Sequence, residues 1–467
     1  MTLGVDTIAA VATAPGGGAL AVVRLSGPGA HAVLQAVAPT LREGLPPPRR
    51  STLAWLRDPY DGEAVDQAVV VRYDAPDSFT GENLVEISCH GGWLVPSLVL
   101  QACLDGGARL AEPGEFTRRA YLNGKVDLVQ AEAVADLVSA RSRAMQRAAL
   151  GHLDRGLSER VTALRRSLVH LEALLAHHLD FPEEDDAPVP LDRVEAEATG
   201  LVDGMDRLLA TASEGELLRE GAVVVLAGRP NVGKSSLYNA LVGEERAIVT
   251  EEPGTTRDAL ESVVQMGGYP FRLVDTAGLR ETEDRVERLG VEVARRHLAR
   301  ADVVLLCTEA GAGLGEPERR FLQELDDVPV VLVETKTDRV EAPGEAAWSG
   351  ERAGDSGDGT VSARVGVSIR TGEGLGALRS LLPDLVYSGL VALGAETPVL
   401  TRRRQARALG EARKEIEAFR AALADAVPAE LAATHLRAAE TALEELVGVV
   451  SVEDVLDVVF KEFCIGK

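Results

Sequence analysis

Over about the first 110 residues, apolar positions fall in short runs that alternate with clusters of Gly, Pro and Asp. Runs rich in Val and Ile between such clusters predict β-strands. The strands are expected at residues 7–13, 19–26, 67–73 and 83–88, with a helix at 94–104. This part of the chain therefore predicts a small α+β domain.

From about residue 116 the apolar spacing changes to that of a helix. Leucines recur three or four residues apart, as at Leu164, Leu168, Leu171 and Leu175. This spacing places them on one face of a helix. The acidic run at 180–186 interrupts the pattern and is typical of a solvated loop.

The later part of the chain alternates between two patterns. Residues 220–383 repeat a strand–loop–helix pattern, and residues 400–460 are helical again. We therefore expect a multidomain fold of α/β and α parts, in which an α/β domain is inserted into a discontinuous helical domain. The expected boundaries are 1–118 for the α+β domain, 119–217 and 384–467 for the two helical parts, and 218–383 for the insertion.

Composition narrows the function classes. The 467-residue chain has a net charge of −24, so it is a poor non-specific binder of nucleic acid, and any RNA contact needs a local basic patch or a partner subunit. Its four cysteines form no C-x-x-C pair, which argues against a zinc ribbon or a disulfide framework. The chain has no signal-peptide pattern and no apolar run long enough to cross a membrane, so we expect a cytoplasmic protein without membrane contact.

The inserted domain carries a phosphate-binding motif. A predicted strand at 222–227 is followed by residues 228–235, which fit G-x-x-x-x-G-K-S, and then by a predicted helix. This order of strand, glycine loop and helix disfavours an ordinary glycine-rich turn. Glycines let backbone N–H groups converge on phosphates. Lys234 is expected to reach the β- and γ-phosphates, and the Ser235 hydroxyl to ligate Mg²⁺.

Four more loops bordering predicted strands complete a guanine-nucleotide site. Asp275 can hold Mg²⁺ through water, and Thr256 can join the Mg²⁺ shell only while the γ-phosphate is present. Asp338 can accept from two N–H donors of guanine that adenine lacks. The expected nucleotide-binding residues are Asn231, Val232, Gly233, Lys234, Ser235, Ser236, Thr250, Thr255, Thr256, Asp275, Thr276, Ala277, Gly278, Thr335, Lys336, Asp338, Ser368, Ile369 and Arg370.

Together these motifs resemble the translation-factor-like GTPases and imply a Ras-like P-loop fold for the insertion. Two positions depart from that pattern. Thr335 replaces the Asn of the usual Asn-Lys-x-Asp guanine motif, so base affinity is expected to drop somewhat while Asp338 keeps the specificity. Leu279 stands where many small GTPases have a Gln that orients water, and Leu cannot do this.

Over nearly all its length the chain resembles the MnmE (TrmE) family of tRNA-modification GTPases. The matching motifs are Asp6-Thr7-Ile8-Ala9, Pro15-Gly16-Gly17-Gly18, Arg24-Leu25-Ser26-Gly27, Ser78-Phe79-Thr80-Gly81-Glu82, His90-Gly91-Gly92, Pro113-Gly114-Glu115-Phe116-Thr117, Leu122-Asn123-Gly124-Lys125 and the tail Phe463-Cys464-Ile465-Gly466-Lys467. The tail and the N-terminal motifs separate the chain from ribosome-assembly GTPases.

This resemblance implies partners and a second cofactor. The family forms a homodimer through its N-terminal domains and works with MnmG, an FAD-dependent subunit, in a heterotetramer. The complex builds a carboxymethylaminomethyl or aminomethyl group at C5 of the wobble uridine of certain tRNAs. The resemblance also implies that the N-terminal domain binds a folate, as 5-formyl- or methylene-tetrahydrofolate, through positions matching Arg24, Glu86, Lys125 and Lys467.

The resemblance further implies GTP hydrolysis that is activated by K⁺. The ligand positions match Asn231, Thr250, Glu252 and Thr255. Glu287 matches the residue that orients water, which would supply what Leu279 lacks, and Lys234 and Thr256 complete the expected catalytic set. Cys464 is either a nucleophile or a packed or merely exposed thiol.

Three features of the sequence are open to more than one interpretation. Residues 16–21 fit a dinucleotide fingerprint but lie in a predicted hairpin turn, and His90-Gly91-Gly92 favours a backbone turn over an oxyanion loop. A basic cluster at Arg402, Arg403, Arg404, Arg407, Arg413 and Lys414 fits either tRNA phosphates or a solvated helix face. The alternative overall function is a regulatory GTP switch in ribosome assembly that carries out no modification chemistry.

Overall fold

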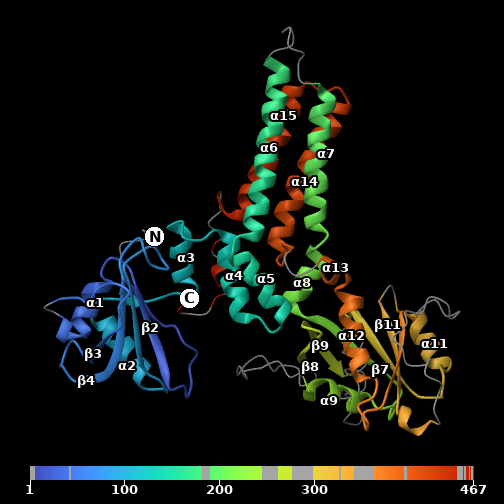
Figure 1. Ribbon diagram of the computed structural model, residues 1–467, viewed down its shortest axis with the longest axis horizontal. Helices are drawn as coiled ribbons and strands as arrows, with labels where there is room; N and C mark the ends of the chain where they lie inside the picture. The colour runs from blue at the N-terminus through green and yellow to red at the C-terminus, as the bar shows by residue number, and fades with distance from the viewer. Residues whose placement is uncertain are drawn as a thin grey trace, which may run out of the picture. The chain divides into compact units, whose positions relative to one another are not determined.

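The computed structural model describes residues 6–41, 44–180, 190–244, 261–275, 298–325, 328–340, 361–393 and 397–449, with residues 456, 459–461, 463 and 466 beyond them (Figure 1). The chain divides into two compact units. One comprises Met1–Ala135 with Leu443–Lys467, and the other comprises Asp136–Ala442. None of the described helices is both long enough and apolar enough to span a membrane.

A six-stranded sheet forms the core of the first unit, in the order β3-β4-β5-β2-β1-β6. The strands are β1 (Ile8–Val11), β2 (Leu20–Ser26), β3 (Thr52–Arg57), β4 (Ala64–Tyr73), β5 (Leu84–His90) and β6 (Arg109–Leu110). Helices α1 (Ala30–Val37) and α2 (Val95–Asp105) pack buried Val, Leu and Cys side chains against it. The predicted α+β fold is confirmed, although the pattern analysis missed β3, β6 and α1.

The C-terminal segment packs back onto the first unit. Phe460 and Phe463 lie in one buried cluster with Leu128 of α4 (Leu128–Ser139), close to α3 (Glu115–Leu122). Gly114 has φ +69°, and a Cβ there would lie 2.6 Å from the carbonyl oxygen of Phe460. A residue larger than glycine at this position would therefore push the C-terminal segment away.

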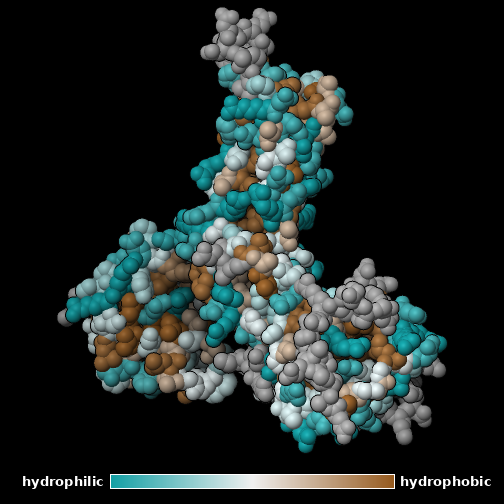
Figure 2. All heavy atoms as spheres, turned by 45° about the vertical axis from the view of Figure 1, so that its right-hand side comes forward, coloured by the Kyte–Doolittle hydropathy of each residue, from teal (hydrophilic) through white to brown (hydrophobic). Residues whose placement is uncertain are grey.

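The helical part of the second unit is built from both predicted helical stretches. Its helices are α5 (Arg143–Leu153), α6 (Gly156–Asp180), α7 (Leu191–Leu209), α8 (Ala212–Glu220), α14 (Arg403–Ala424) and α15 (Ala429–Val447). Helix α7 packs on both α6 and α14, and Arg165 of α6 pairs with Glu440 of α15 at 2.8 Å. Figure 2 shows hydrophilic residues over much of the outside of these helices. The two stretches thus form one discontinuous helical part, as predicted.

The α/β part of the second unit holds a sheet in the order β12-β11-β10-β7-β9-β8. Its elements are β7 (Ala222–Gly228), α9 (Lys234–Glu244), β8 (Glu261–Met266), β9 (Tyr269–Asp275), β10 (Val303–Glu309), α11 (Glu316–Gln323), β11 (Val330–Thr335), β12 (Ala363–Val367), α12 (Leu375–Val386) and α13 (Ser388–Leu393). All neighbours pair in parallel except β8, which pairs antiparallel with β9 at one edge. The predicted boundary at 383/384 falls inside α12, and the boundaries of the domains stay predictions.

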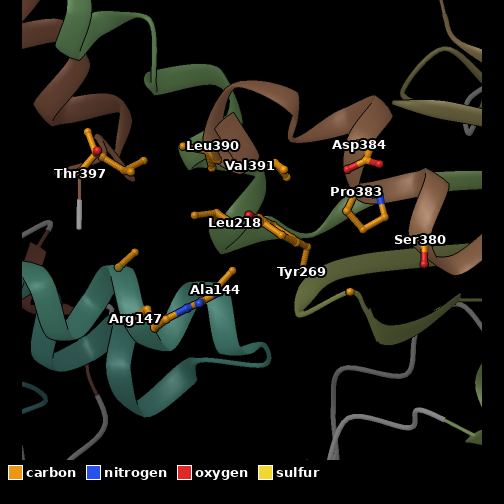
Figure 3. A pocket seen from close by; sticks show the side chains of 13 residues that line it. Ala144, Arg147, Leu218, Tyr269, Ser380, Pro383, Asp384, Leu390, Val391 and Thr397 are labelled. Atoms are coloured by element: carbon orange, nitrogen blue, oxygen red, sulfur yellow. The ribbon is translucent and has the colours of Figure 1, made fainter. Parts of the chain in front are cut away.

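A polar and aromatic joint connects this sheet to the helical part. Tyr387 is buried at the end of α12, and its hydroxyl lies 2.8 Å from the carbonyl oxygen of Pro270 and 3.1 Å from that of Leu217. Its ring stacks on Tyr269, with 4.7 Å between the ring centroids. The carboxylate of Glu214 accepts from the backbone of α13. The joint borders an open cavity of about 430 Å³ (Figure 3).

Candidate functional site

The phosphate loop connects the end of β7 to the start of α9. Gly228 has φ +133°, and a Cβ there would lie 2.3 Å from the carbonyl oxygen of Cys307 on the neighbouring strand β10. Asn231 takes a left-handed conformation with φ +63°, and Gly233 has φ +102°. These backbone conformations curl the loop around the first turn of α9, where free N–H groups attract an anion.

Lys234 lies under this loop and is 7% exposed. Its ammonium donates to the carbonyl oxygens of Gly228 at 2.9 Å and Arg229 at 2.7 Å, both within the loop. A lysine held here has its charge at the place where phosphate oxygens would sit. The predicted role of Lys234 in phosphate binding therefore fits its geometry.

Oxygen donors suitable for Mg²⁺ lie beside the loop. Ser235 is exposed on the first turn of α9, and Asp275 is buried at the end of β9, which pairs with β7. A hydroxyl and a carboxylate next to phosphates match the oxygen ligands that Mg²⁺ prefers. Within the described residues no cluster of three or more His, Cys, Asp or Glu side chains forms a metal site.

The guanine-reading loops meet at the neighbouring edge of the sheet. Asp338 accepts a hydrogen bond from the Ser368 hydroxyl at 2.9 Å and another from Nε of Arg370 at 2.9 Å. The hydrogen bond from Ser368 and the charge of Arg370 outweigh burial and hold the pKa of Asp338 below its usual value. The carboxylate is thus ionised and able to accept from donors of a base. Arg370 is 74% exposed, so a base could displace it at little cost.

Thr335 and Lys336 tie the guanine-reading segment to the phosphate loop. The buried Thr335 hydroxyl bonds the carbonyl oxygen of Val232 and lies 3.0 Å from that of Thr308. Lys336 has φ +58° and donates from Nζ to the carbonyl oxygen of Asn231 at 2.9 Å. The structure therefore brings together the loops at 228–236, 335–338 and 368–370 that the sequence analysis had singled out separately.

Several predicted site residues lie outside the described residues. They are Thr250, Glu252, Thr255, Thr256, Thr276, Ala277, Gly278, Leu279, Glu287, Cys464 and Lys467. Of the predicted K⁺ ligands, only Asn231 is described, and it is exposed. The predicted roles of these residues stay predictions.

In the N-terminal unit, two of the predicted folate residues contact each other. Arg24 on β2 and Glu86 on β5 are register partners, and Arg24 donates to Oε1 of Glu86 at 2.7 Å. The guanidinium also lies over the rings of Phe79 and Phe116, 5.7 and 5.8 Å from their centroids. This combination of charge and aromatic faces suits a flat heterocycle that carries carboxylates.

Lys125 and Tyr73 extend the same neighbourhood. Lys125 donates to the carbonyl oxygen of Pro76, and its side-chain carbons lie against Gly81, on the loop that carries Phe79. Tyr73 points its hydroxyl at Glu86, 3.4 Å away. Burial, and then the charge of Glu86, raises the pKa of Tyr73, so the phenol stays protonated. The sequence analysis missed Tyr73, because only the β4–β5 register places it beside Glu86.

Other N-terminal motif residues form a buried scaffold beneath this neighbourhood. Arg119 is 3% exposed and contacts the carboxylates of Asp6, Glu82 and Glu115 at 2.8–3.1 Å. Ser26 in turn bonds Glu82 at 2.7 Å. The network ties the chain before β1 to the loop at 78–82 and to α3. Motif residues that carried the family resemblance thus have a structural role.

The basic cluster on α14 is largely neutralised. Arg402 is buried against Asp136 at 2.6 Å, although 266 residues separate them. Further ion pairs join Arg403 to Glu216, Arg413 to Asp206 and Lys414 to Glu411. These contacts favour a structural role for most of the cluster over binding of phosphates.

The described cysteines belong to the apolar core, as predicted. Cys89, Cys103 and Cys307 are at most 1% exposed and are free thiols. Burial raises the pKa of Cys103 and of Cys307 to about 12, so neither thiol ionises near neutral pH. They are poor nucleophiles and poor metal ligands.

Comparison with known proteins gives matches over the whole chain. A family model described as the MnmE helical domain matches residues 128–464, and one described as the GTP-binding protein TrmE N-terminus matches residues 7–125. The chain belongs to the MnmE family. Its relatives include the tRNA modification GTPase MnmE of Moorella thermoacetica, 43% identical over 467 residues and 99% of each chain. Those of Neisseria meningitidis and Laribacter hongkongensis are each 44% identical, over 100% and 99% of each chain.

Among solved structures, the G domain of the T. maritima FeoB iron transporter is 29% identical. It covers 36% of this chain and 98% of that chain, with a TM-score of 0.25. A TM-score this low carries no argument about the fold. The fold is defined by the strand order and by the family models. The predicted MnmE family, its GTPase class and the three-part fold class are confirmed.

Proposed function

We propose that this chain binds and hydrolyses GTP with Mg²⁺ and uses that cycle in modifying tRNA. The modification is a carboxymethylaminomethyl or aminomethyl group at C5 of the wobble uridine. The observation that supports the proposal most directly is the meeting of the phosphate loop with Asp338 through Thr335 and Lys336. One nucleotide could then contact Lys234 with its phosphates and Asp338 with its base.

Each residue has a defined task in hydrolysis. Lys234 neutralises charge on the β- and γ-phosphates, and Ser235 with Thr256 holds Mg²⁺. Asn231, Thr250, Glu252 and Thr255 would hold K⁺, which would supply positive charge against the phosphates, comparable to an arginine finger. Glu287 orients the attacking water.

The N-terminal unit supplies the folate site in this proposal. Arg24, Glu86 and Lys125 form this site, in which a basic group suits the glutamyl carboxylates and Glu86 can accept from N–H groups of the pterin. Lys467 would be the fourth residue of this site. When bound, the folate supplies a one-carbon unit. The chain works as a homodimer, together with an MnmG-type FAD-dependent subunit, in the cytoplasm.

Two measurements test the proposal. GTP hydrolysis by the full chain is expected to be much faster in KCl than in NaCl at equal ionic strength, and equal rates refute the K⁺ site. Wobble-uridine analysis by mass spectrometry in cells lacking the protein is expected to show loss of the C5 modification. Normal modification, together with no binding of 5-formyltetrahydrofolate, would instead favour a regulatory switch.

A further inference from the structure

A strongly cationic stretch of this acidic chain lies on α5 and the first half of α6. Residues 141–166 contain seven arginines, no lysine and only two carboxylates, Asp154 and Glu159. The chain as a whole has a net charge of −24. A local surplus of positive charge against that background requires a reason other than general solubility.

Six of these arginines are exposed, and we call them the arginine surface: Arg141, Arg143, Arg147, Arg155, Arg160 and Arg166. Only Arg165, the seventh, has an ion pair, with Glu440. Within the described part of the chain, the guanidinium groups of the other six form no ion pair or hydrogen bond. The basic residues of α14 differ, since most of them pair with carboxylates.

The six arginines follow two helices that pack on each other. Arg143 and Arg147 are four residues apart on α5, and Arg155 begins the turn into α6. Arg155 to Arg166 covers 11 residues, or roughly 16 Å of helix at 1.5 Å per residue. Arg160 and Arg166, six residues apart, lie about 120° apart around the helix axis, so phosphates could be reached on two sides of α6. Arginine also binds phosphate through two parallel N–H groups, which lysine cannot do.

Arg155 adds an independent observation. Its φ is +67°, a left-handed conformation that glycine adopts without strain and that other side chains rarely adopt. The position thus carries an exposed arginine where glycine would fit the backbone better. Strain retained at one residue points to a use for its side chain.

We propose that the arginine surface of α5 and α6 binds the phosphate backbone of the tRNA substrate. This assignment rests on the proposed function, and it names the part of this chain that contacts the RNA. The long-range field of the chain repels RNA, so binding depends on these few contacts and is sensitive to salt.

The test uses the full chain, an unmodified tRNA transcript, and binding measured from about 50 to about 200 mM salt. The variant is Arg155→Gly with Arg160→Gln and Arg166→Gln. We expect tRNA affinity to fall at least tenfold and the slope of log K against log salt to become shallower by about two, since each lost phosphate contact removes about 0.7–0.9. Arg155→Gly alone is expected to weaken tRNA binding without lowering the melting temperature.

The matched control is Arg413→Gln with Lys414→Gln on α14, which is expected to leave tRNA binding unchanged. Unchanged affinity and slope in the α6 variant overturn the proposal, as does a wild-type chain that binds no tRNA alone or with its partner. If the α6 variant binds tRNA normally but no longer binds the FAD-dependent subunit, the arginine surface binds an acidic protein, and the proposal is also overturned. GTP hydrolysis, measured in parallel, is expected to be normal in every variant, and its absence in the wild type would instead refute the proposed function.

Discussion

The buried hydroxyl of Thr335 donates a hydrogen bond to the carbonyl oxygen of Val232. This bond joins the end of strand β11 to the phosphate loop. The sequence analysis treated this threonine only as a shorter substitute for asparagine. In the structure it also lies 3.0 Å from the carbonyl oxygen of Thr308. The residue therefore fixes the distance between the segment that reads the base and the segment that binds the phosphates.

Thr335→Val tests this link, because valine keeps the shape and removes the hydroxyl. Val232 would lose its buried hydrogen-bond donor, which costs about 1–3 kcal/mol. We expect a lower denaturation midpoint and weaker GDP binding by calorimetry. Thr335→Ser retains the hydroxyl and is the control. Equal GDP affinity in the valine variant and the wild type would show that the link does not organise the site.

Asp338→Asn is expected to change the base preference. The carboxylate accepts from two donors of guanine, whereas the amide presents a donor to one of them. Loss of charged hydrogen bonds at about 1.5–3 kcal/mol each weakens GTP binding roughly a hundredfold or more. Xanthosine triphosphate, which has an oxygen in place of the guanine amine, should bind the variant better than GTP does. Competition between the two nucleotides measures this, and a retained preference for GTP would refute the role of Asp338.

Tyr387→Phe tests the joint between the sheet and the helices. The buried Tyr387 hydroxyl donates to the carbonyl oxygens of Pro270 and Leu217. Its removal is expected to lower the free energy of unfolding by about 1–3 kcal/mol. Tyr269→Phe is the control, because it retains the ring stacking and removes a hydroxyl that has no hydrogen-bond partner among the described residues. Chemical denaturation should show a lower midpoint for the first variant alone, and equal midpoints would contradict this role.

The ion pairs of Arg119 with Asp6, Glu82 and Glu115 predict that the stability of the N-terminal unit depends on pH. Burial raises the pKa of Glu115, but hydrogen bonds from Arg109, the Glu112 backbone and Arg119 outweigh it and leave the pKa lowered. A carboxylate with a depressed pKa in the folded state stabilises the fold fully above its ordinary pKa of 4.5, and that stabilisation is lost as the pH falls. We therefore expect the stability of the N-terminal unit to decline below about pH 4.5.

Arg119→Met gives the matched comparison. Removing the cation takes away the charge partner of the largely buried Glu82, while Arg109 still pairs with Asp6 and Glu115. We therefore expect a cost at the lower end of about 3–5 kcal/mol at neutral pH. The difference in stability between this variant and the wild type should narrow as the pH falls through the carboxylate range. Arg57→Met on the surface is the control. A difference that stays constant from pH 7 to pH 3 would rule out the network as its source.

Local patterns predicted the phosphate loop, because its chemistry lies within eight consecutive residues. The same holds for Asp338, whose place after a strand is visible in the sequence. Contacts between distant residues could not be predicted in this way. Nothing in the spacing of Arg402 and Asp136 indicates that they form a buried ion pair, and the pattern instead suggested a cationic helix face for Arg402.

The same limit applies to the N-terminal unit. Arg24 and Glu86 face each other only because β2 and β5 are neighbours in the sheet. The family resemblance placed both residues at the folate site, but it did not indicate that they pair. Strand β3 was missed because its exposed side includes apolar residues such as Leu53 and Trp55, which hide the alternation of a half-buried strand.

Calorimetric titration of the full chain with GDP in magnesium buffer tests the central claim most directly. We predict saturable binding of one GDP per chain, no binding of ADP, and loss of binding in Lys234→Ala. Absence of heat with GDP, or equal affinity for GDP and ADP, would contradict a guanine-nucleotide site at residues 228–236.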